Sequence, residues 1–367
     1  MTKPATPAHR HTGTGTGTGT GTEAAQPVIA TEVVLPGVVD PAGLRLRHRP
    51  LPAPESGQAL VRVEATGISF AEQGMRRGRY PGQPAFPFVP GYDLVGTVDA
   101  VGDAADMALT GRRVAVATKT GGWTSHALVP VADLVPVPAG LDPAEAETVV
   151  VNGITAHQML HRVARVASGQ TILVHGANGG VGTILVQLAR HHGVHVIGTA
   201  APRHHSALRD LGVTPLDYHD PDLSTRVGEL APDGVDAVFD HLGLTSARAS
   251  FHLLSRGGAL VVYGTAARLD DTNAMVPMFL GLLARVYAWN LLPNHRSAAF
   301  YNFWGGRTIR PRRFRRHQHH DLGVVLDLLA SGAITAQIAA RFPLTEVGAA
   351  MELAESRTVR GKVVLHP

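Results

Sequence analysis

The chain has no cysteine, no hydrophobic run long enough to cross a bilayer and no acidic residue in its most basic segment. Without cysteine it forms no disulfide, binds no zinc through thiolates and uses no cysteine nucleophile. The longest apolar stretch, near Met275–Ala284, stops at Arg285, well short of the roughly 20 residues that a membrane-spanning helix needs. No apolar segment near the N-terminus resembles a signal peptide, so we expect a soluble cytoplasmic protein.

The basic segment Arg307–Arg316 holds six arginines and no acid, and it changes the net charge of the chain from −2 to +4. His317, His319 and His320 follow it directly. Two interpretations are open: the segment contacts RNA or another polyanion, or it is a solvated loop or helix start. We favour the second, and we expect no nucleic-acid partner.

Length and composition leave room for two domains, because the chain has 367 residues of which 44% are hydrophobic. Residues 1–27, with the alternating Gly/Thr tract Gly13–Thr22, contain little to bury, and we expect a disordered tail. Short apolar runs separated by Pro and Gly then indicate an irregular β domain. These runs are Val33–Leu35, Leu44–Leu46, Ala59–Val63, Leu94–Val98, Arg113–Ala117 and Ser125–Pro130, and a helical pattern follows at Pro143–Asn152.

The segment Thr171–Gly198 predicts a strand, a glycine loop, a helix and a second strand in immediate succession. Thr171–Val174 is a short apolar run, and Ile184, Leu185, Leu188 and Ala189 recur at helical spacing. The glycines of the loop, at Gly176, Gly179 and Gly182, therefore sit at a strand-to-helix turn, where backbone N–H groups hold a pyrophosphate. The segment predicts a bound dinucleotide, and the alternative is a tight turn without a ligand.

The end of the second strand indicates which dinucleotide is bound. Sites for NAD usually place an acid there to hold the ribose 2′-hydroxyl, but this chain continues Gly198-Thr199-Ala200-Ala201-Pro202-Arg203. A small, uncharged strand end followed by an arginine suits a 2′-phosphate, so we expect NADPH. The alternative is that Arg203 only begins the next helix on a solvated face.

Several motifs, in this order, resemble the medium-chain dehydrogenase/reductase superfamily, and most closely its zinc-free quinone oxidoreductase branch. The resemblance covers the chain from about residue 28 onward. It is carried by Gly67–Glu72, Arg77–Pro81, Pro90–Gly96, Asn152–Ala156, Gly176–Gly182, Gly332–Ile334, Phe342–Leu344 and Ser356–Leu365.

The resemblance implies an α/β fold, a GroES-like β domain plus a Rossmann domain with a doubly wound parallel sheet. It places the GroES-like domain at residues 28–152, completed by about 318–367, and the Rossmann domain at 153–317, with the active site in the cleft between them. The apolar runs Val235–Asp240 and Ala259–Tyr263 independently predict further strands of the second domain.

The resemblance also implies a site without zinc. Zinc alcohol dehydrogenases of this superfamily have a cysteine where this chain has Ser69, and Gly-His-Glu where it has Gly91-Tyr92-Asp93. Without a Lewis acid, alcohol oxidation loses several kcal/mol of stabilisation, which leaves the reduction of an activated acceptor. We expect no metal cofactor.

Two hydroxyl groups are the candidate catalytic groups. Tyr80 matches the cleft tyrosine of the RxGxYP motif, and Ser69 stands where quinone oxidoreductases often have Asn. Either is suited to stabilise charge on the acceptor oxygen. The alternatives are a pocket-rim role for Tyr80 and a strand end at Ser69. Gly74 replaces a tyrosine that some relatives carry, and we expect Glu72 to bind cleft backbone rather than to act in catalysis.

The cofactor positions follow from the loop and from the resemblance. The loop and strand-end residues are Gly176, Ala177, Asn178, Gly179, Gly180, Val181, Gly182, Thr199 and Ala200. The resemblance adds Asn152 and Thr155 near the nicotinamide ribose, Gly264 near the nicotinamide, and Arg203, Tyr218 and Arg357 around the adenosine phosphate.

We therefore expect an NADPH-dependent, zinc-free oxidoreductase that transfers hydride to a quinone or an α,β-unsaturated carbonyl. An enoyl reductase acting on a polyketide-like or acyl-thioester intermediate is the nearest enzymatic alternative, and a non-catalytic dinucleotide- or RNA-binding protein is the alternative from another class. Phe300–Trp304 is either the edge strand of a homodimer or an aromatic core strand, and we expect a homodimer.

Overall fold

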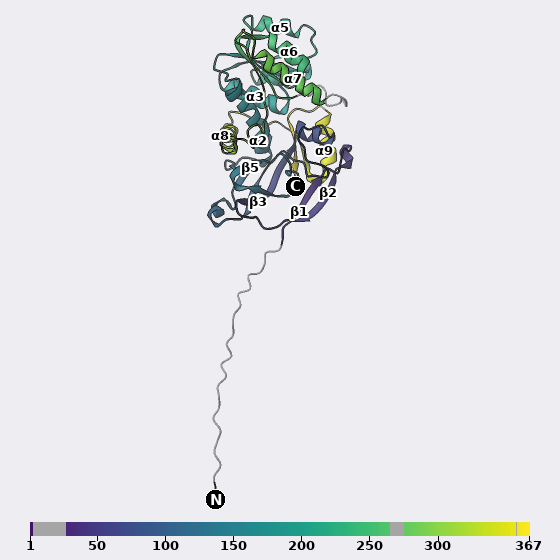
Figure 1. Cartoon of the computed structure of the whole chain (residues 1–367), viewed down its shortest axis with the longest axis vertical. Helices are drawn as coiled ribbons and strands as arrows, with labels where there is room; N and C mark the ends of the chain where they lie inside the picture. Colours follow the sequence, from purple (N-terminus) through teal and green to yellow (C-terminus); the bar gives the residue numbers. More distant parts are fainter. Residues whose placement is uncertain (3–26, 265–274, 357) are drawn as a thin grey trace.

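The structure is a computed structural model that describes residues 1–2, 27–264, 275–356 and 358–367 (Figure 1). The Gly/Thr tract lies outside the described residues. Within them the chain forms a parallel sheet, a mixed sheet and a small two-stranded sheet, with helices packed around them.

All strands of the parallel sheet run in the same direction, and the first of them in the chain lies near the middle. In spatial order the strands are β10 (Thr214–Asp217), β9 (His195–Ala200), β8 (Thr171–His175), β11 (Val235–Asp240), β12 (Leu254–Val262) and β13 (Ser297–Phe300). The chain moves outward from β8 to β10 and then returns to the other side of β8 at β11. This order is that of a doubly wound Rossmann sheet, which binds ligands beyond the carboxyl ends of the strands where the direction reverses. The predicted Rossmann fold is confirmed.

The mixed sheet contains strands that precede the parallel sheet in the chain and strands that follow it. In spatial order it contains β14 (Ile338–Pro343), β15 (Lys362–His366), β3 (Gln58–Ile68), β4 (Asp93–Val101), β5 (Arg113–Ala117) and β7 (Val135–Pro136), and β6 (His126–Pro130) also pairs with β3. The separate two-stranded sheet is β1 (Ile29–Val34) with β2 (Arg45–Pro50). Because β15 lies between β14 and β3, the C-terminal segment completes the sheet that the N-terminal part begins.

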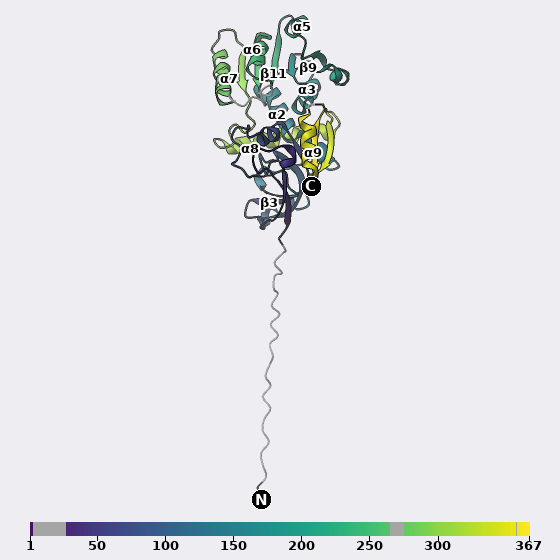
Figure 2. The same ribbon diagram turned by 90° about the vertical axis from the view of Figure 1, so that its right-hand side faces the viewer.

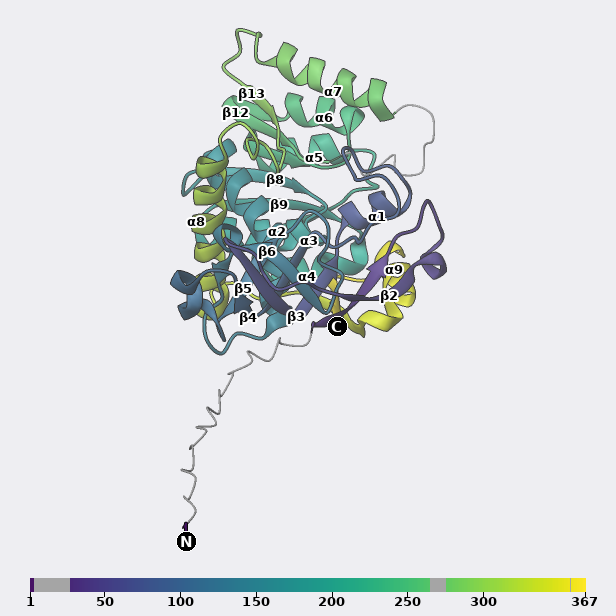
Figure 3. The same ribbon diagram turned by 60° about the horizontal axis from the view of Figure 1, so that its bottom comes forward.

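Helices pack on both sheets and between them. They are α1 (Phe70–Arg76), α2 (Pro143–His157), α3 (Gly180–His191), α4 (His205–Asp210), α5 (Leu223–Leu230), α6 (Leu244–His252), α7 (Met275–Trp289), α8 (Pro311–Ala330) and α9 (Val347–Glu355). Figure 1 shows two lobes, one with α3, α5, α6 and α7 and the other with β1, β2, β3 and α9, with α2 between them. In Figure 2, α8 and α9 lie to either side of α2. In Figure 3, α7 lies at the outer edge beside α6. Among the described residues no helix is long and apolar enough to cross a membrane.

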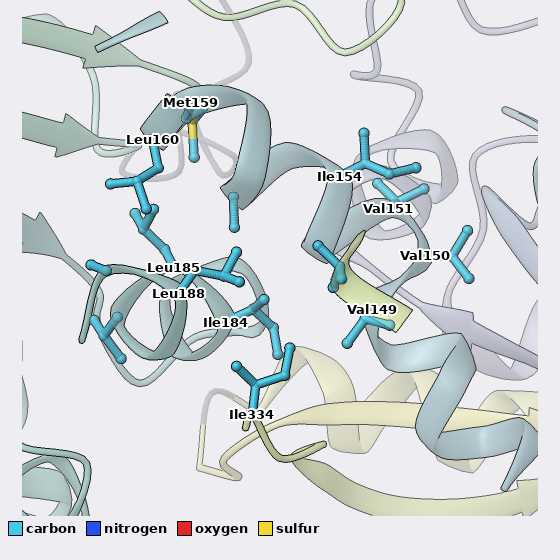
Figure 4. Close-up of a cluster of buried hydrophobic side chains, with 14 of the residues drawn as sticks. Val149, Val150, Val151, Ile154, Met159, Leu160, Ile184, Leu185, Leu188 and Ile334 are labelled. Atoms are coloured by element: carbon cyan, nitrogen blue, oxygen red, sulfur yellow. The ribbon is translucent and has the colours of Figure 1, made fainter. Parts of the chain in front are cut away.

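The helix α2 is buried over most of its length, polar residues such as Glu147 and Asn152 included. It begins at the N-cap Asp142, whose carboxylate accepts from the N–H groups of Ala144 and Glu145 at 2.9 and 3.1 Å. Figure 4 shows the branched side chains of Val149–Val151 and Ile154 in the same cluster as Ile184, Leu185 and Leu188 of α3. This cluster continues from one lobe into the other, so α2 joins the two lobes by apolar packing.

Close approach of α8 to α2 depends on Gly153. A Cβ atom at this position would lie 2.7 Å from Cγ1 of Val325 in α8. The expected domain boundaries near 152/153 and 317/318 fall inside α2 and α8, because both helices continue through them. The division of the chain into these ranges stays a prediction.

The aromatic segment Phe300–Trp304 is not a strand as a whole. The edge strand β13 ends at Phe300, and only the N–H of Tyr301 still bonds to the sheet, at 2.8 Å from the carbonyl oxygen of Val262. The following residues turn away toward the other lobe, where Trp304 reaches Tyr92. Both sequence interpretations of this segment are therefore wrong beyond Phe300, because aromatic rings here fill the space between lobes and not a sheet face.

A buried ionic cluster joins β15, β4 and α2. Nζ of Lys362 lies 2.9 Å from Oδ2 of Asp93 and 2.5 Å from Oε1 of Glu147. Each of the three residues is at most 4% exposed. A Cβ at Gly67 would lie 2.4 Å from both Oε1 of Glu147 and Cε of Lys362, so only glycine leaves room for the cluster at that position. The two carboxylates are compensated by a single ammonium group supplied by the last strand of the sheet.

Three histidine rings are in contact where α2, α3 and α8 meet, one pair tilted and the other edge-to-face. The ring of His161 has its centre 4.7 Å from that of His157 and 5.0 Å from that of His192. Burial, together with the charges of His157, His192 and Arg162, lowers the pKa of His161 to about 4, although Asp321 opposes the shift. Burial also lowers the pKa of His157, against the attraction of Asp321. Both rings are therefore neutral at pH 7.

We expect the folded protein to lose stability as the pH falls from about 6.5 toward 4. In that pH window His161 is protonated in the unfolded chain but not in the folded chain, because folding lowers its pKa from 6.5 to about 4. The contribution of the neutral His161 to the free energy of unfolding is fully present above pH 6.5 and is lost as the pH falls toward 4. Urea midpoints measured at pH 7.5 and pH 5 give the slope, and His161→Gln should flatten it. The exposed residue His252 offers the control His252→Gln, and an equal slope in all three proteins would contradict the assignment.

Candidate active site

The glycine loop connects β8 to α3 as the sequence predicts. Gly176 has φ of +65°, a conformation that favours glycine, and the N–H of Gly179 bonds to its carbonyl oxygen at 2.9 Å. A Cβ at Gly182 would lie 2.2 Å from the same carbonyl oxygen, so the first turn of α3 packs directly against the loop. Gly179 caps the helix, and the first N–H groups of α3, from Gly180 to Gly182, have no partner within the helix. This arrangement fits a pyrophosphate.

The other loop residues and the end of β9 line the same place. Ala177 is buried and its N–H bonds to the carbonyl oxygen of Thr199 at 3.0 Å, while Asn178 and Val181 are half-buried. The hydroxyl of Thr199 accepts the N–H of Gly176 at 3.2 Å. Ala200 is buried at the end of the strand.

A series of hydrogen-bonded polar side chains beneath the glycine loop was not predicted from the sequence. One ring nitrogen of His175 lies 3.2 Å from the Thr199 hydroxyl and the other lies 3.1 Å from the Ser250 hydroxyl. Ser250 donates in turn to Asp240 at 2.9 Å. The partners come from three different strands and a helix, and no local pattern marks them. Burial lowers the pKa of His175, so the imidazole in this series of hydrogen bonds is neutral.

His241 lies between two of the expected cofactor positions. A Cβ at Gly176 would lie 2.4 Å from the His241 ring, and one at Gly264 would lie 3.1 Å from the His241 carbonyl oxygen. Its Nδ1 is buried and has no hydrogen-bond partner among the residues that the structure describes. Burial lowers the pKa of His241 to about 4. The structure thus brings Gly176 and Gly264 together around a neutral imidazole.

Basic groups gather past the end of β9. Arg203 is exposed and its Nε donates to Nε2 of His204 at 3.2 Å. Burial and the positive charges of Arg203 and Arg360 lower the pKa of His204, so both arginines act on one ring. Asp217 pairs with Ala200, which places the half-exposed Tyr218 one residue beyond the same sheet edge. Arg357 lies outside the described residues, and Arg360 is a basic group that the sequence analysis did not select.

Two residues of α2 approach the loop and the aromatic segment. A Cβ at Gly180 would lie 2.8 Å from Nδ2 of Asn152, so the amide reaches the start of α3. Thr155, one turn later, lies next to Tyr301, and burial raises the pKa of that tyrosine above its usual range. The Tyr301 hydroxyl donates to Oε1 of Gln158 at 3.0 Å. Asn152 and Thr155 therefore lie between the cofactor loop and the segment that leads to Trp304.

The hydroxyl of Tyr80 meets that of Tyr92. The two hydroxyl groups are hydrogen-bonded, and Nε1 of Trp304 donates to the Tyr92 hydroxyl. Tyr92 is 4% exposed, whereas Tyr80 is only half-buried. Burial raises the pKa of both tyrosines, and the nearby charge of Glu72 adds to the shift, so both stay protonated at neutral pH. The sequence analysis selected Tyr80 but missed Tyr92 and Trp304.

Ser69 serves the start of α1. Its hydroxyl accepts the N–H of Ala71 at 3.1 Å and donates to the carboxylate of Glu72, which also accepts the Ser69 N–H at 2.8 Å. This is a capping box, and it commits the Ser69 proton to Glu72. The other oxygen of Glu72 accepts the N–H of Tyr92 at 2.6 Å, which confirms the expected backbone role of Glu72.

The arginine cluster is divided among three environments. Arg307 lies over the Trp304 ring at 4.8 Å, and Arg315 pairs with Asp133 at 2.6 Å. Arg310 and Arg313 line a cavity of about 270 Å³ beside the aromatic segment. Five of the six arginines lie at the N-cap or in the first two turns of α8, so the segment forms a helix start.

No group of three or more His, Asp or Glu side chains in the described part of the chain is placed to hold a metal. At the position where zinc dehydrogenases carry a histidine ligand, Tyr92 instead bonds to Tyr80 and Trp304. At the cysteine position, Ser69 caps α1. At these two positions the described residues form hydrogen bonds to one another.

Comparison with known proteins agrees with this geometry. The family model for the alcohol dehydrogenase GroES-like domain matches residues 55–139, and that for zinc-binding dehydrogenases matches residues 211–365. The synaptic vesicle membrane protein VAT-1 homolog of Rattus norvegicus is 33% identical over 338 residues, which cover 88% of this chain and 81% of that protein. The quinone oxidoreductase of Rattus norvegicus is 32% identical over 240 residues, covering 63% of this chain and 73% of the relative.

Among solved structures, a mycobacterial protein in complex with NADPH superimposes with a TM-score of 0.77 at 30% identity, covering 92% of this chain and all of that one, 100%. The matches to both domains, the relatives that span most of the chain, and the combination of a parallel and a mixed sheet agree. The chain is an oxidoreductase that belongs to the medium-chain dehydrogenase/reductase superfamily, in its quinone oxidoreductase-like branch.

Proposed function

We propose that the protein is an NADPH-dependent, zinc-free reductase that transfers hydride to a quinone or an α,β-unsaturated carbonyl. The observation that carries the proposal is the half-buried hydroxyl of Tyr80, anchored by Tyr92 on the same apolar cluster that holds the glycine loop. A relative named quinone oxidoreductase and a structural neighbour solved with NADPH support it.

The residues present fit a dinucleotide with a 2′-phosphate. The start of α3 offers N–H groups for the pyrophosphate, and Gly176 and Gly182 leave the backbone open to it. Arg203 and Arg360 provide positive charge beyond β9, where the strand end carries no acid. We assign Asn152 and Thr155, which lie next to the aromatic segment, to the nicotinamide end of the cofactor.

When bound, NADPH supplies a hydride. The chain's own task is to place the acceptor carbon within reach and to stabilise the charge that gathers on the acceptor oxygen. Tyr80 is the group we assign to that oxygen, because its proton is retained at neutral pH and its hydroxyl is the less buried of the pair. Ser69 has its proton committed to Glu72, so we assign it a structural role.

The acceptor class is tested by mixing the purified protein with NADPH and following the loss of NADPH absorbance. Quinones, 2-alkenals, cyclic enones and enoyl thioesters are supplied separately. Rapid oxidation with a quinone or enone supports the proposal, and turnover confined to enoyl thioesters would assign the enoyl reductase alternative. Cofactor binding with no turnover on any acceptor, together with salt-sensitive RNA retention, would support the non-catalytic alternative.

The cofactor assignment makes its own prediction. Arg203→Ala should raise the KM for NADPH by about tenfold or more and change that for NADH little, because a charge-assisted bond to a phosphate contributes about 1.5–3 kcal/mol. Arg360→Ala should act in the same direction. The exposed Arg209 of α4 provides the charge-matched control Arg209→Ala. Equal effects on the two cofactors would refute the 2′-phosphate site.

A homodimer and a cytoplasmic location remain proposals that rest on the resemblance and on the sequence. In favour of a dimer, β13 is an edge strand, and neighbouring residues such as Leu291 and Leu292 expose apolar surface at 84% and 47%.

A further inference from the structure

We propose that Trp304 and Tyr92 form a one-way hydrogen-bond array that directs the Tyr80 proton at the acceptor oxygen and does not conduct protons. The inference rests on the proposed function for the identity of the acceptor, and it assigns positioning roles to two residues outside the motifs that led to Tyr80. It follows from counting donors and acceptors along three side chains.

The first step is the indole of Trp304. An indole N–H only donates, and here it donates to the Tyr92 hydroxyl oxygen. The Trp304 ring is held in place by Tyr92, at a centroid distance of 5.5 Å, by Phe303 at 4.9 Å and by Phe314 at 5.9 Å. The direction of this bond is therefore fixed.

The second step is the buried Tyr92. Its hydroxyl carries one proton, and in the described structure the partners of that hydroxyl are Trp304 and Tyr80. Trp304 cannot accept, so the proton is satisfied only if Tyr92 donates to the Tyr80 oxygen. The backbone N–H of Tyr92 is bound to Glu72 at 2.6 Å, and its ring packs edge-on against Tyr80 at 5.8 Å and 81°. Tyr92 thus has little freedom to turn away.

The third step is Tyr80. Because its oxygen accepts from Tyr92, its own proton is left for a third partner, and the half-exposed position of the side chain lets that partner be a ligand. Hydride addition to the acceptor carbon moves an electron pair to the acceptor oxygen, while the nicotinamide is oxidised. Tyr80 then donates to an oxyanion, and the three donors align in one direction as that charge forms.

The array is closed at its inner end. A proton lost from Tyr80 cannot be replaced through Tyr92 from Trp304, because the indole gives up no proton at ordinary pH. The proton that completes the reduced product therefore comes from water. The array lowers the energy of the anion and takes no part in the proton transfer that follows.

Binding of 4-nitrophenol tests the array without turnover, because its phenolate mimics the product anion and is coloured. With NADP⁺ present, the unaltered protein should bind the phenolate about tenfold more tightly than Tyr92→Phe or Trp304→Phe, the amount expected for one hydrogen bond. Trp304→His keeps a ring N–H and should recover part of the affinity. Tyr287→Phe removes a hydroxyl at an exposed position outside the array and is the control. Equal phenolate affinity in Trp304→Phe and the unaltered protein would overturn the array.

Kinetics separate the array from a proton shuttle. Tyr92→Phe should lower kcat about tenfold and leave the KM for NADPH and the solvent isotope effect on kcat unchanged. A solvent isotope effect that changes in Tyr92→Phe would show that a proton passes through Tyr92. It would overturn the claim that the array conducts no protons. If the phenolate result holds but no quinone or enone is reduced, the array stands and the proposed acceptor class fails.

Discussion

Tyr80→Phe should lower kcat by about 10²- to 10³-fold, the loss typical of removing one donor to a developing oxyanion. The change deletes one oxygen from a half-buried position, so folding should be preserved. The KM for NADPH should stay near its original value, because the positions that we assign to the cofactor lie on the loop after β8, the start of α3, the end of β9 and α2. Steady-state kinetics with the best acceptor of the panel measure the effect.

Tyr287 offers a matched control for this substitution. It is 72% exposed on α7, and Tyr287→Phe should leave kcat unchanged. Far-ultraviolet circular dichroism and a thermal melt establish that each variant is folded. A Tyr80→Phe protein that is folded and retains more than a third of the original kcat would assign Tyr80 to the pocket rim.

Lys362→Met should reduce the free energy of unfolding by about 3–5 kcal/mol, the range for breaking a buried ion pair by removing one partner. The substitution leaves Asp93 and Glu147 buried together without the ammonium group that contacts both. Urea unfolding measures the loss. Lys119→Met is the control, because the Lys119 amine bonds only to an exposed carbonyl of Gly82 in the described structure.

The pH dependence of the Lys362→Met variant gives an independent check. Burial already raises the pKa of Glu147 against the attraction of Lys362, and removing the lysine takes away that attraction. The folded variant then takes up protons that the unfolded chain does not bind, so its deficit should shrink as the pH falls. Adding Glu147→Gln should also recover part of the loss. A deficit that grows on acidification, or no recovery, would show that the cluster is not the cause.

The sequence predicts those parts of the fold that depend on a local pattern of apolar residues and glycines. The runs at Thr171–Val174 and Val235–Asp240 became β8 and β11, and the glycine loop lies between strand and helix. The start of β12 was less accurate: the strand begins at Leu254, five residues before the expected Ala259, because Gly257 and Gly258 interrupt the apolar run without ending the strand.

The candidate site was predictable only where one residue carries the signal. Tyr80 lies in a recognisable motif. Trp304, which donates to the Tyr92 hydroxyl, is 212 residues from Tyr92 in the chain, and no periodicity connects the two. The sequence suggested Ser69 as a hydrogen-bond donor to the acceptor oxygen. In the structure its hydroxyl instead donates to the carboxylate of Glu72, three residues later. Arg360 was missed because its neighbour His204 comes from the other lobe. Contacts across lobes carry no local pattern, so the structure is needed to find them.

The placement of β15 has a consequence for synthesis of the chain on the ribosome. β3 and β4 emerge early, but β15 and the ammonium group of Lys362 follow only after all strands of the parallel sheet have been made. Until then Asp93 and Glu147 lack their counter-charge, and Thr66–Ile68 of β3 lack the neighbour that β15 later provides. The lobe that contains β3 and β4 therefore cannot complete its sheet until β15 has left the ribosome, after every strand of the parallel sheet has been made.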